Sequence, residues 1–288
     1  MTKATMSSAK QGTTTTTLPT VAVFGLGWLG APLGQCLVRE GHKVVGSVTS
    51  QAKQDALQRQ GIEAQVMALP REVSADTTWL STVPMCDVAV INIPPSKAGI
   101  KAGIFADNVL ALAQQLQQQG CSQIIFISTT SVYGETRGEI SESTPPTPNT
   151  ASGKAHVEIE QGLFDLFATN ATVLRLSGLI GSDRHPVRSL VKKPSLTAGG
   201  RPVNLIRQDD VIAAILAILQ GRGVGEVLHL ASNDHPSRSE YYTQMADIYG
   251  LDAPNFIDET GENDKRINAS KSFAILKITP RSIFTRFD

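Results

Sequence analysis

The sequence is poor in cysteine and has no cysteine pattern that binds a metal. The three cysteines, Cys36, Cys86 and Cys121, are far apart in a chain of 288 residues and form no CxxC or Cys/His spacing. We therefore expect neither a disulfide framework nor a zinc site, and no other metal site is indicated. Each cysteine is expected to act as a small hydrophobe in a reducing compartment.

The chain also lacks an excess of either charge and any long hydrophobic run. Its 26 basic and 26 acidic residues balance, so neither nucleic acid nor an anionic membrane is an expected partner. No apolar stretch is long enough to cross a bilayer, and the polar first 19 residues lack the apolar core of a secretory signal. We expect residues 1–18 to be a disordered tail and the protein to be cytoplasmic.

What the sequence does contain is a regular alternation of apolar runs and helical patterns, with 41% hydrophobic residues. Strands are predicted at 21–24, 43–48, 62–67, 88–93, 123–128 and 171–176, and helices at 28–39, 51–60, 102–119 and 152–167. This order is typical of an α/β fold, a Rossmann doubly wound parallel sheet, over residues 19–176. Residues 177–288 are less regular and are expected to form mainly a small α+β substrate-binding lobe over the carboxyl ends of the strands.

A glycine-rich turn joins the first predicted strand to the first predicted helix. Gly25 permits a tight turn, Gly27 lets the backbone approach a pyrophosphate, and Gly30 lets the helix pack against the strand. Trp28 and Leu29 complete the turn, and the start of the helix offers free amides to an anion. The turn therefore predicts a site for NAD or NADP.

The residues after the second predicted strand bear on which of the two cofactors is bound. An acidic residue that grips the ribose 2′-hydroxyl of NAD is expected at position 48, where the sequence has a valine. Thr49, Ser50 and Lys53 follow, and their side chains can donate to a 2′-phosphate. We therefore favour NADP over NAD, while ordinary surface roles for these three residues stay open.

The segment Ser128-Thr-Thr-Ser-Val-Tyr-Gly134 resembles the extended short-chain dehydrogenase/reductase family, of the NAD-dependent epimerase/dehydratase type. The glycine turn, Arg175-Leu-Ser-Gly-Leu-Ile-Gly181 and the helix that opens at Asp209 support the resemblance, and the Gly-Trp-Leu-Gly form of the turn is similar to the YeeZ-like branch. The resemblance implies an oxidoreductase or epimerase, a nucleotide-sugar substrate, and a homodimer with a four-helix interface as one assembly.

The chemistry of that family uses a serine or threonine, a tyrosine and a lysine. By position, Thr129 matches the residue that orients the substrate oxygen, and Lys154 matches the lysine that holds the nicotinamide ribose. The tyrosine is expected four residues before the lysine, where this sequence has Thr150. An alcohol is a far poorer general base than a phenol, so this departure puts turnover in doubt.

Three alternatives remain open for a chain without that tyrosine. Tyr133 can act as the acid/base from the other side of the pocket, although the resemblance implies that it only lines the substrate site. His185 can donate the proton, because histidine titrates near neutrality. The protein can also bind a dinucleotide without turnover, as a sensor or regulatory protein. Ser131, Arg184 and His185 are further candidates for substrate contacts.

Overall fold

The computed structural model of the protein describes residues 18–72 and 76–287, so almost all of the predicted N-terminal tail lies outside the described residues. A seven-stranded sheet in the order β10-β7-β5-β4-β1-β2-β3 forms its centre, and every strand pair in it is parallel. The strands are β1 (Val21–Phe24), β2 (Val44–Val48), β3 (Ile62–Val66), β4 (Val88–Ile91), β5 (Gln123–Thr129), β7 (Ala171–Leu176) and β10 (Val227–Leu230). The predicted Rossmann sheet is confirmed.

The strand order places a switch point between β1 and β4. From β1 the chain winds outward through β2 to β3, and then returns to β4 on the other side of β1. Because the crossovers leave the sheet in opposite directions from this point, a crevice opens at the carboxyl ends of β1 and β4. The topology therefore fixes where a ligand can bind.

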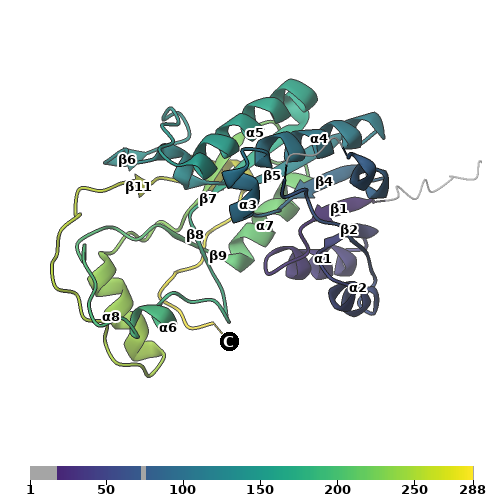
Figure 1. The fold of residues 1–288 in the computed structure, drawn as a ribbon. Helices are drawn as coiled ribbons and strands as arrows, with labels where there is room; N and C mark the ends of the chain where they lie inside the picture. Colours follow the sequence, from purple (N-terminus) through teal and green to yellow (C-terminus); the bar gives the residue numbers. More distant parts are fainter. Residues whose placement is uncertain (1–17, 73–75, 288) are drawn as a thin grey trace, which may run out of the picture.

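Helices cover both faces of the sheet, and the alternation of side chains along each strand supplies both layers. Val21 and Val23 face the layer that contains α1 and α7, whereas Ala22 and Phe24 face α4 and α5. Figure 1 shows these two layers on opposite sides of the sheet. These helices are α1 (Gly30–Arg39), α4 (Phe105–Gln118), α5 (Ala151–Phe167) and α7 (Gln208–Leu219), and α2 (Gln51–Gln58) and α3 (Lys97–Lys101) lie along the connections.

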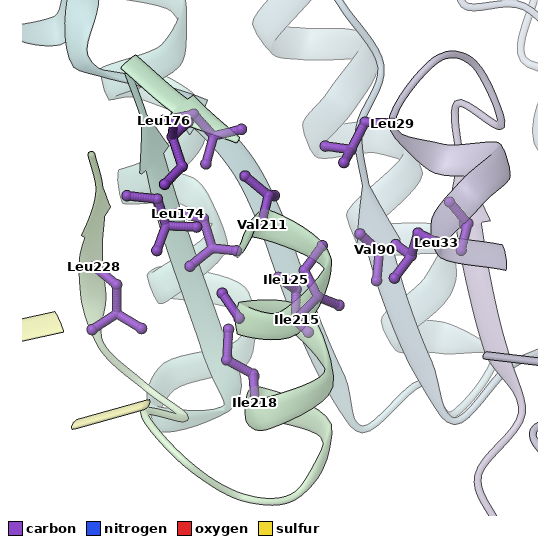
Figure 2. Close-up of a cluster of buried hydrophobic side chains, with 14 of the residues drawn as sticks. Leu29, Leu33, Val90, Ile125, Leu174, Leu176, Val211, Ile215, Ile218 and Leu228 are labelled. Atoms are coloured by element: carbon purple, nitrogen blue, oxygen red, sulfur yellow. The ribbon is translucent and has the colours of Figure 1, made fainter. Parts of the chain in front are cut away.

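The core on the α1 and α7 side shows that the C-terminal part of the chain completes the Rossmann layers. Val211, Ile215 and Ile218 of α7 pack toward Leu174 of β7, as Figure 2 shows, and Leu228 of β10 belongs to the same cluster. Burial of such aliphatic side chains stabilises the fold by roughly 1.5–3 kcal/mol each. Two elements beyond residue 176, α7 and β10, thus belong to the sheet and its cover rather than to a separate lobe.

Other C-terminal elements form a small lobe beside the carboxyl ends of the strands (Figure 1). Its apolar cluster includes Val187, Tyr241, Met245 and Ile283. Two short parallel pairs, β8 with β9 and β6 with β11, accompany it. The lobe contains β8 (Gly178–Ile180), α6 (Val187–Leu190), β9 (Leu205–Arg207) and α8 (Arg238–Ile248), whereas β6 (Glu139–Ile140) and β11 (Arg266–Ile267) form a pair of their own. The last helix, α9 (Ser270–Leu276), packs with α7 and β10 in the core beside the sheet. Short 3-10 helices are η1 (Thr78–Thr82), η2 (Thr130–Tyr133) and η3 (Ala168–Asn170).

The cysteines are free thiols, and two of them meet in the core. Cys86 and Cys121 precede the adjacent strands β4 and β5, which brings their sulfur atoms to 3.8 Å. Within the described residues, no group of three or more His, Cys, Asp and Glu side chains is placed to hold a metal ion. No helix in that part of the chain has the length and apolar character needed to cross a membrane.

Candidate functional site

A cavity of about 650 Å³ opens at the carboxyl ends of β1, β2 and β4, at the switch point of the sheet. The glycine turn forms its floor, and the segments that follow β2, β3 and β4 form its walls. Residues from β5, α5, β8 and the loop after β8 line the part of the cavity farthest from β3. Its lining includes Gly25, Gly27, Trp28, Leu29, Ser47, Val48, Thr49, Lys53, Arg71, Asn92, Ile127, His156, Leu179 and Arg184.

The three glycines of the turn differ in what surrounds them. Gly25 has φ +96°, and a Cβ there would lie 2.4 Å from the Asn92 carbonyl oxygen. A Cβ at Gly30 would lie 2.2 Å from the Gly25 carbonyl oxygen, so this glycine lets α1 pack against the turn. A Cβ at Gly27 would meet nothing within 4 Å, since it would project into open space. Only Gly27 is thus left free for a ligand.

Two side chains hold the turn in place. Ser47 Oγ accepts a hydrogen bond from the Gly25 amide at 3.0 Å, and Asn92 Nδ2 donates to the Gly25 carbonyl at 3.1 Å. The N-cap of α1, Leu29, offers no side-chain acceptor, and the first turn has no acidic residue. The positive end of the helix therefore remains open to an anion. The sequence pattern did not identify Ser47 or Asn92, although polar residues at strand ends are the general signal.

The charge of the cavity is positive. Lys53, Arg71 and Arg184 line it, and no aspartate or glutamate among the described residues does. Thr49 lies in the lining as well, whereas Ser50 is the N-cap residue of α2 and does not. The side chain at position 48 is a buried valine of the core cluster. Arg71, which no motif indicated, is brought into the same cavity as Lys53 by the chain that leaves β3.

Trp28 connects the glycine turn with the loop after β8. Its indole Nε1 donates to Asp183 Oδ1 at 2.5 Å, and the Arg184 guanidinium lies 5.0 Å from its ring centroid. The Trp28 carbonyl accepts from Gln208 Nε2 at 2.8 Å, at the start of α7. A cation over an indole is a favourable contact. The predicted residues Trp28 and Arg184 thus meet at the cavity, although the sequence separates them widely.

The residues predicted for catalysis lie outside the residues that line the cavity. Thr129 and Ser131 have their side-chain oxygens 2.5 Å apart at the end of β5. Thr150, at the place expected for the tyrosine, caps α5, since its Oγ1 accepts from the Gly153 amide at 3.0 Å. Lys154 lies in the first turn of α5, and its side chain is exposed. These residues gather near the start of α5 without pointing a general base at the cavity.

Tyr133 is fully buried in a polar network behind the cavity. Arg175 Nη1 donates to its hydroxyl at 2.7 Å, and the hydroxyl lies 2.5 Å from His229 Nε2. His229 Nδ1 faces the Asn268 carbonyl at 3.0 Å, so Nδ1 carries the hydrogen and Nε2 accepts from the tyrosine. Glu160 pairs with Arg175 at 2.6 Å. Burial raises the pKa of Tyr133, and these contacts make it a structural residue in this arrangement.

His185 lies in the core of the C-terminal lobe and does not line the cavity. Its Nδ1 accepts from the Val187 amide at 3.3 Å, so Nε2 carries the hydrogen and donates to the Tyr241 hydroxyl at 2.9 Å. Burial, followed by the positive charge of Arg188, lowers the pKa of His185 from 6.5 to about 4. A neutral, bonded imidazole in this place does not support the hypothesis of a proton donor to substrate.

His156 is the one imidazole among the described residues that line the cavity, and the sequence pattern did not identify it. It lies on α5 with only 6% of its surface exposed, and it is part of the lining. Its Nδ1 is 2.7 Å from the Ser152 carbonyl oxygen, one turn earlier. Burial lowers its pKa. No sequence motif includes His156, so only its position on α5 at the cavity identifies it.

The doubly wound sheet, the glycine turn and the cavity at the switch point define a dinucleotide-binding protein of the Rossmann type. Residues 21–228 match the model of the NAD dependent epimerase/dehydratase family, and the chain belongs to that family. Among curated proteins, it is similar to protein YeeZ of Escherichia coli strain K12, with 36% identity over 236 residues that cover 82% of this chain and 86% of YeeZ. The resemblance inferred from the sequence is confirmed.

Solved structures show the same fold at low sequence identity. A UDP-glucose 4-epimerase of Thermotoga maritima superposes with a TM-score of 0.75 and 18% identity, covering 92% of this chain and 95% of that one. A UDP-glucuronic acid 4-epimerase of Bacillus cereus, solved in complex with NAD, gives 0.72 and 21%, covering 92% and 94%. A functionally unknown conserved protein from Silicibacter pomeroyi gives 0.69 and 22%, covering 90% and 93%.

Proposed function

We propose that this protein is an NAD(P)-dependent oxidoreductase or epimerase that acts on a nucleotide-sugar type of substrate. The observation that carries the proposal is the open space beside Gly27, where a side chain would meet nothing within 4 Å. This space lies at the uncapped start of α1 in a cavity lined by basic residues. A pyrophosphate fits such a cradle, because backbone amides and the helix dipole both favour an anion there.

The residues of the cavity divide between the two ends of a dinucleotide. Thr49, Lys53 and Arg71 come from the first half of the sheet, which holds the adenosine side in Rossmann proteins. Ile127 of β5 and Leu179 of β8, which lies in the short strand pair outside the central sheet, would line the nicotinamide side. When bound, the nicotinamide supplies or accepts a hydride, which is chemistry that the side chains of the protein do not provide.

The cofactor is further proposed to be NADP rather than NAD. The cavity lining that follows β2 and β3 includes the hydroxyl group of Thr49 and two cations, Lys53 and Arg71. No carboxylate among the described residues lines the cavity. A 2′-phosphate binds to cations, whereas the 2′-hydroxyl of NAD is usually gripped by an acid. The family description and the NAD held by the Bacillus cereus epimerase favour NAD instead. The choice between NADP and NAD is therefore tested directly by titration with both cofactors.

The proposed substrate class follows from the family and from two features of the chain. The solved structures of similar fold include epimerases of UDP-sugars. Arg184 reaches over the cavity from the loop after β8 and can bind a substrate phosphate. The paired hydroxyls of Thr129 and Ser131, at the end of β5, are the candidates for holding a sugar oxygen.

A second function, dinucleotide binding without turnover, is favoured by the use of Thr150. Its hydroxyl is already the cap of α5, and an alcohol with a pKa far above neutrality does not serve as a general base. Tyr133 and His185, the two substitutes considered from the sequence, are bonded on both sides within buried networks. A sensor or regulatory protein would need the cavity and none of these groups.

One experiment tests binding, and a second separates the two functions. Titration of the protein with NADPH, followed by the fluorescence of the reduced nicotinamide, is expected to saturate at micromolar concentrations. Incubation with a panel of nucleotide sugars is then followed at the absorbance band of the reduced nicotinamide and by chromatography of the sugars. Failure to bind NADPH and NADH at millimolar concentrations would contradict both functions. Binding without turnover on any sugar would leave the sensor as the function.

A further inference from the structure

The inside of the cavity contains one imidazole, that of His156, at the end formed by the second half of the sheet. Ile127 of β5 and Leu179 of β8 line the same end, whereas Lys53 and Arg71 line the other. The glycine turn lies between the two groups. A dinucleotide whose pyrophosphate lies at Gly27, and whose adenosine lies toward Lys53, places its nicotinamide nucleoside toward His156.

The orientation of the His156 ring is fixed by its surroundings. A carbonyl oxygen only accepts, so the contact of Nδ1 with the Ser152 carbonyl at 2.7 Å requires the hydrogen to be on Nδ1. The rings of Phe105 and Phe126, with centroids 5.7 and 5.8 Å away, hold the imidazole from the sides. Nε2 is then an acceptor, and it has no hydrogen-bond partner among the described residues. Burial keeps this ring neutral by lowering its pKa.

Lys154 and His156 cannot both face the cavity. Successive residues of an α-helix are separated by about 100°, so two residues apart means about 200°, which is the opposite side of α5. His156 is buried at the cavity and Lys154 is exposed. Ser152 lies one turn before His156 and shares its side of the helix. The register of α5 therefore selects His156 and not the lysine.

We propose that His156 contacts the cofactor, its Nε2 accepting a hydrogen bond from a hydroxyl group of the nicotinamide ribose. The residue takes the place that the sequence pattern had assigned to Lys154. This inference rests on the proposed function, because it needs a dinucleotide in the cavity. It gives this chain a neutral acceptor at the point where the resembled enzymes have a cation.

Calorimetric binding of two probes tests the assignment. NADPH includes the nicotinamide ribose, whereas ADP ends at the pyrophosphate. His156→Ala is expected to weaken NADPH binding about tenfold and to leave ADP binding within twofold of the wild type. Lys154→Ala is the competing variant. Glu158→Ala, an exposed change on the same helix, is the matched control and is expected to change neither affinity.

The outcomes separate the inference from the proposed function. Wild-type affinity for NADPH in His156→Ala, or a selective loss in Lys154→Ala instead, would overturn the role of His156 while dinucleotide binding stands. No binding of NADPH or NADH by the wild type would overturn both. If His156→Ala does not fold, NMR of the wild type labelled with ¹⁵N-histidine decides, with His156→Gln for assignment. The Nε2 resonance of His156 is expected to shift with NADPH and not with ADP, and an unmoved resonance would reject the contact.

Discussion

Trp28 and Asp183 are 155 residues apart in the sequence, and the indole Nε1 of the tryptophan donates to the carboxylate at 2.5 Å. This bond joins the glycine turn to the loop that carries Arg184 over the cavity. A Cβ at Gly181 would lie 2.6 Å from the Trp28 ring, so the loop packs closely on the indole. The turn that is expected to hold the pyrophosphate thus also positions the roof of the cavity.

We therefore expect Trp28→Ala to weaken cofactor binding without unfolding the protein. The change removes the indole bond and the surface on which Arg184 rests, so the loop loses its anchor. Trp28→Phe retains a ring for Arg184 and loses only the bond to Asp183. The expected loss of NADPH affinity is about tenfold for Trp28→Ala and about threefold for Trp28→Phe, on the scale of roughly 1.4 kcal/mol per tenfold. Equal affinities for all three proteins would contradict this role.

Gly27→Ala and Gly30→Ala form a matched pair that separates binding from folding. A methyl group at residue 27 meets nothing in the protein, whereas at residue 30 it would lie 2.2 Å from a carbonyl oxygen. Gly27→Ala is expected to keep the melting temperature and to lose at least about tenfold in NADPH affinity. Gly30→Ala is expected to lose about 1–3 kcal/mol of stability through overpacking. Thermal unfolding and fluorescence titration measure the two effects, and the reverse pattern would contradict the assigned roles.

The cofactor preference is tested by removing the two cations that follow β2 and β3 in the cavity lining. Because a 2′-phosphate is present only in NADPH, Lys53→Ala and Arg71→Ala are each expected to weaken NADPH binding about tenfold, a typical value for a charge-assisted hydrogen bond. NADH binding is expected to stay within about twofold. Arg59→Ala, an exposed change at the other end of α2, is the control. Tighter binding of NADH than of NADPH by the wild type would reject the preference.

Tyr133→Phe is expected to reduce stability and to leave binding intact. The lost hydroxyl leaves Arg175 Nη1 and His229 Nε2 without their hydrogen-bond partner in the core, at a cost of about 1–3 kcal/mol. Glu160→Gln is expected to cost more, roughly 3–5 kcal/mol, because it leaves the charge of Arg175 unpaired in the core. Urea unfolding measures both. A stable Tyr133→Phe protein that binds cofactor but has lost turnover would instead restore Tyr133 as the acid/base.

The lowered pKa of His185 predicts how the free energy of unfolding depends on pH. Its pKa is lowered from 6.5 in the unfolded chain to about 4 in the fold, so the unfolded state binds its proton first as the pH falls. The stability contributed by neutral His185 is fully present above about pH 6.5 and is lost progressively toward pH 4, by at most about 1.4 kcal/mol per pH unit. His185→Gln is expected to flatten this dependence in urea titrations between pH 7 and 4.5. An unchanged slope would contradict it.

Local patterns account for the parts of the fold that the sequence predicted correctly. The glycine turn between β1 and α1 needs only short-range information, since strand period, helix period and three glycines all lie within about 20 residues. The Tyr133 segment was recognised for the same reason. The role of Tyr133, however, depends on Arg175 and His229, which come from β7 and β10. No local pattern says that these strands will lie beside each other.

By itself, then, the sequence determined the Rossmann sheet, the place of the glycine turn and the membership of the family, because periodicity and glycine spacing act between neighbours in the chain. The tertiary structure alone decided which side chains reach the cavity. It brought Arg71 and Lys53 into one cavity, bonded Asp183 to Trp28, buried His185 in the lobe and turned His156 rather than Lys154 inward. These outcomes depend on strand order and on the rotation of α5, and both are set by packing between segments that are distant in sequence.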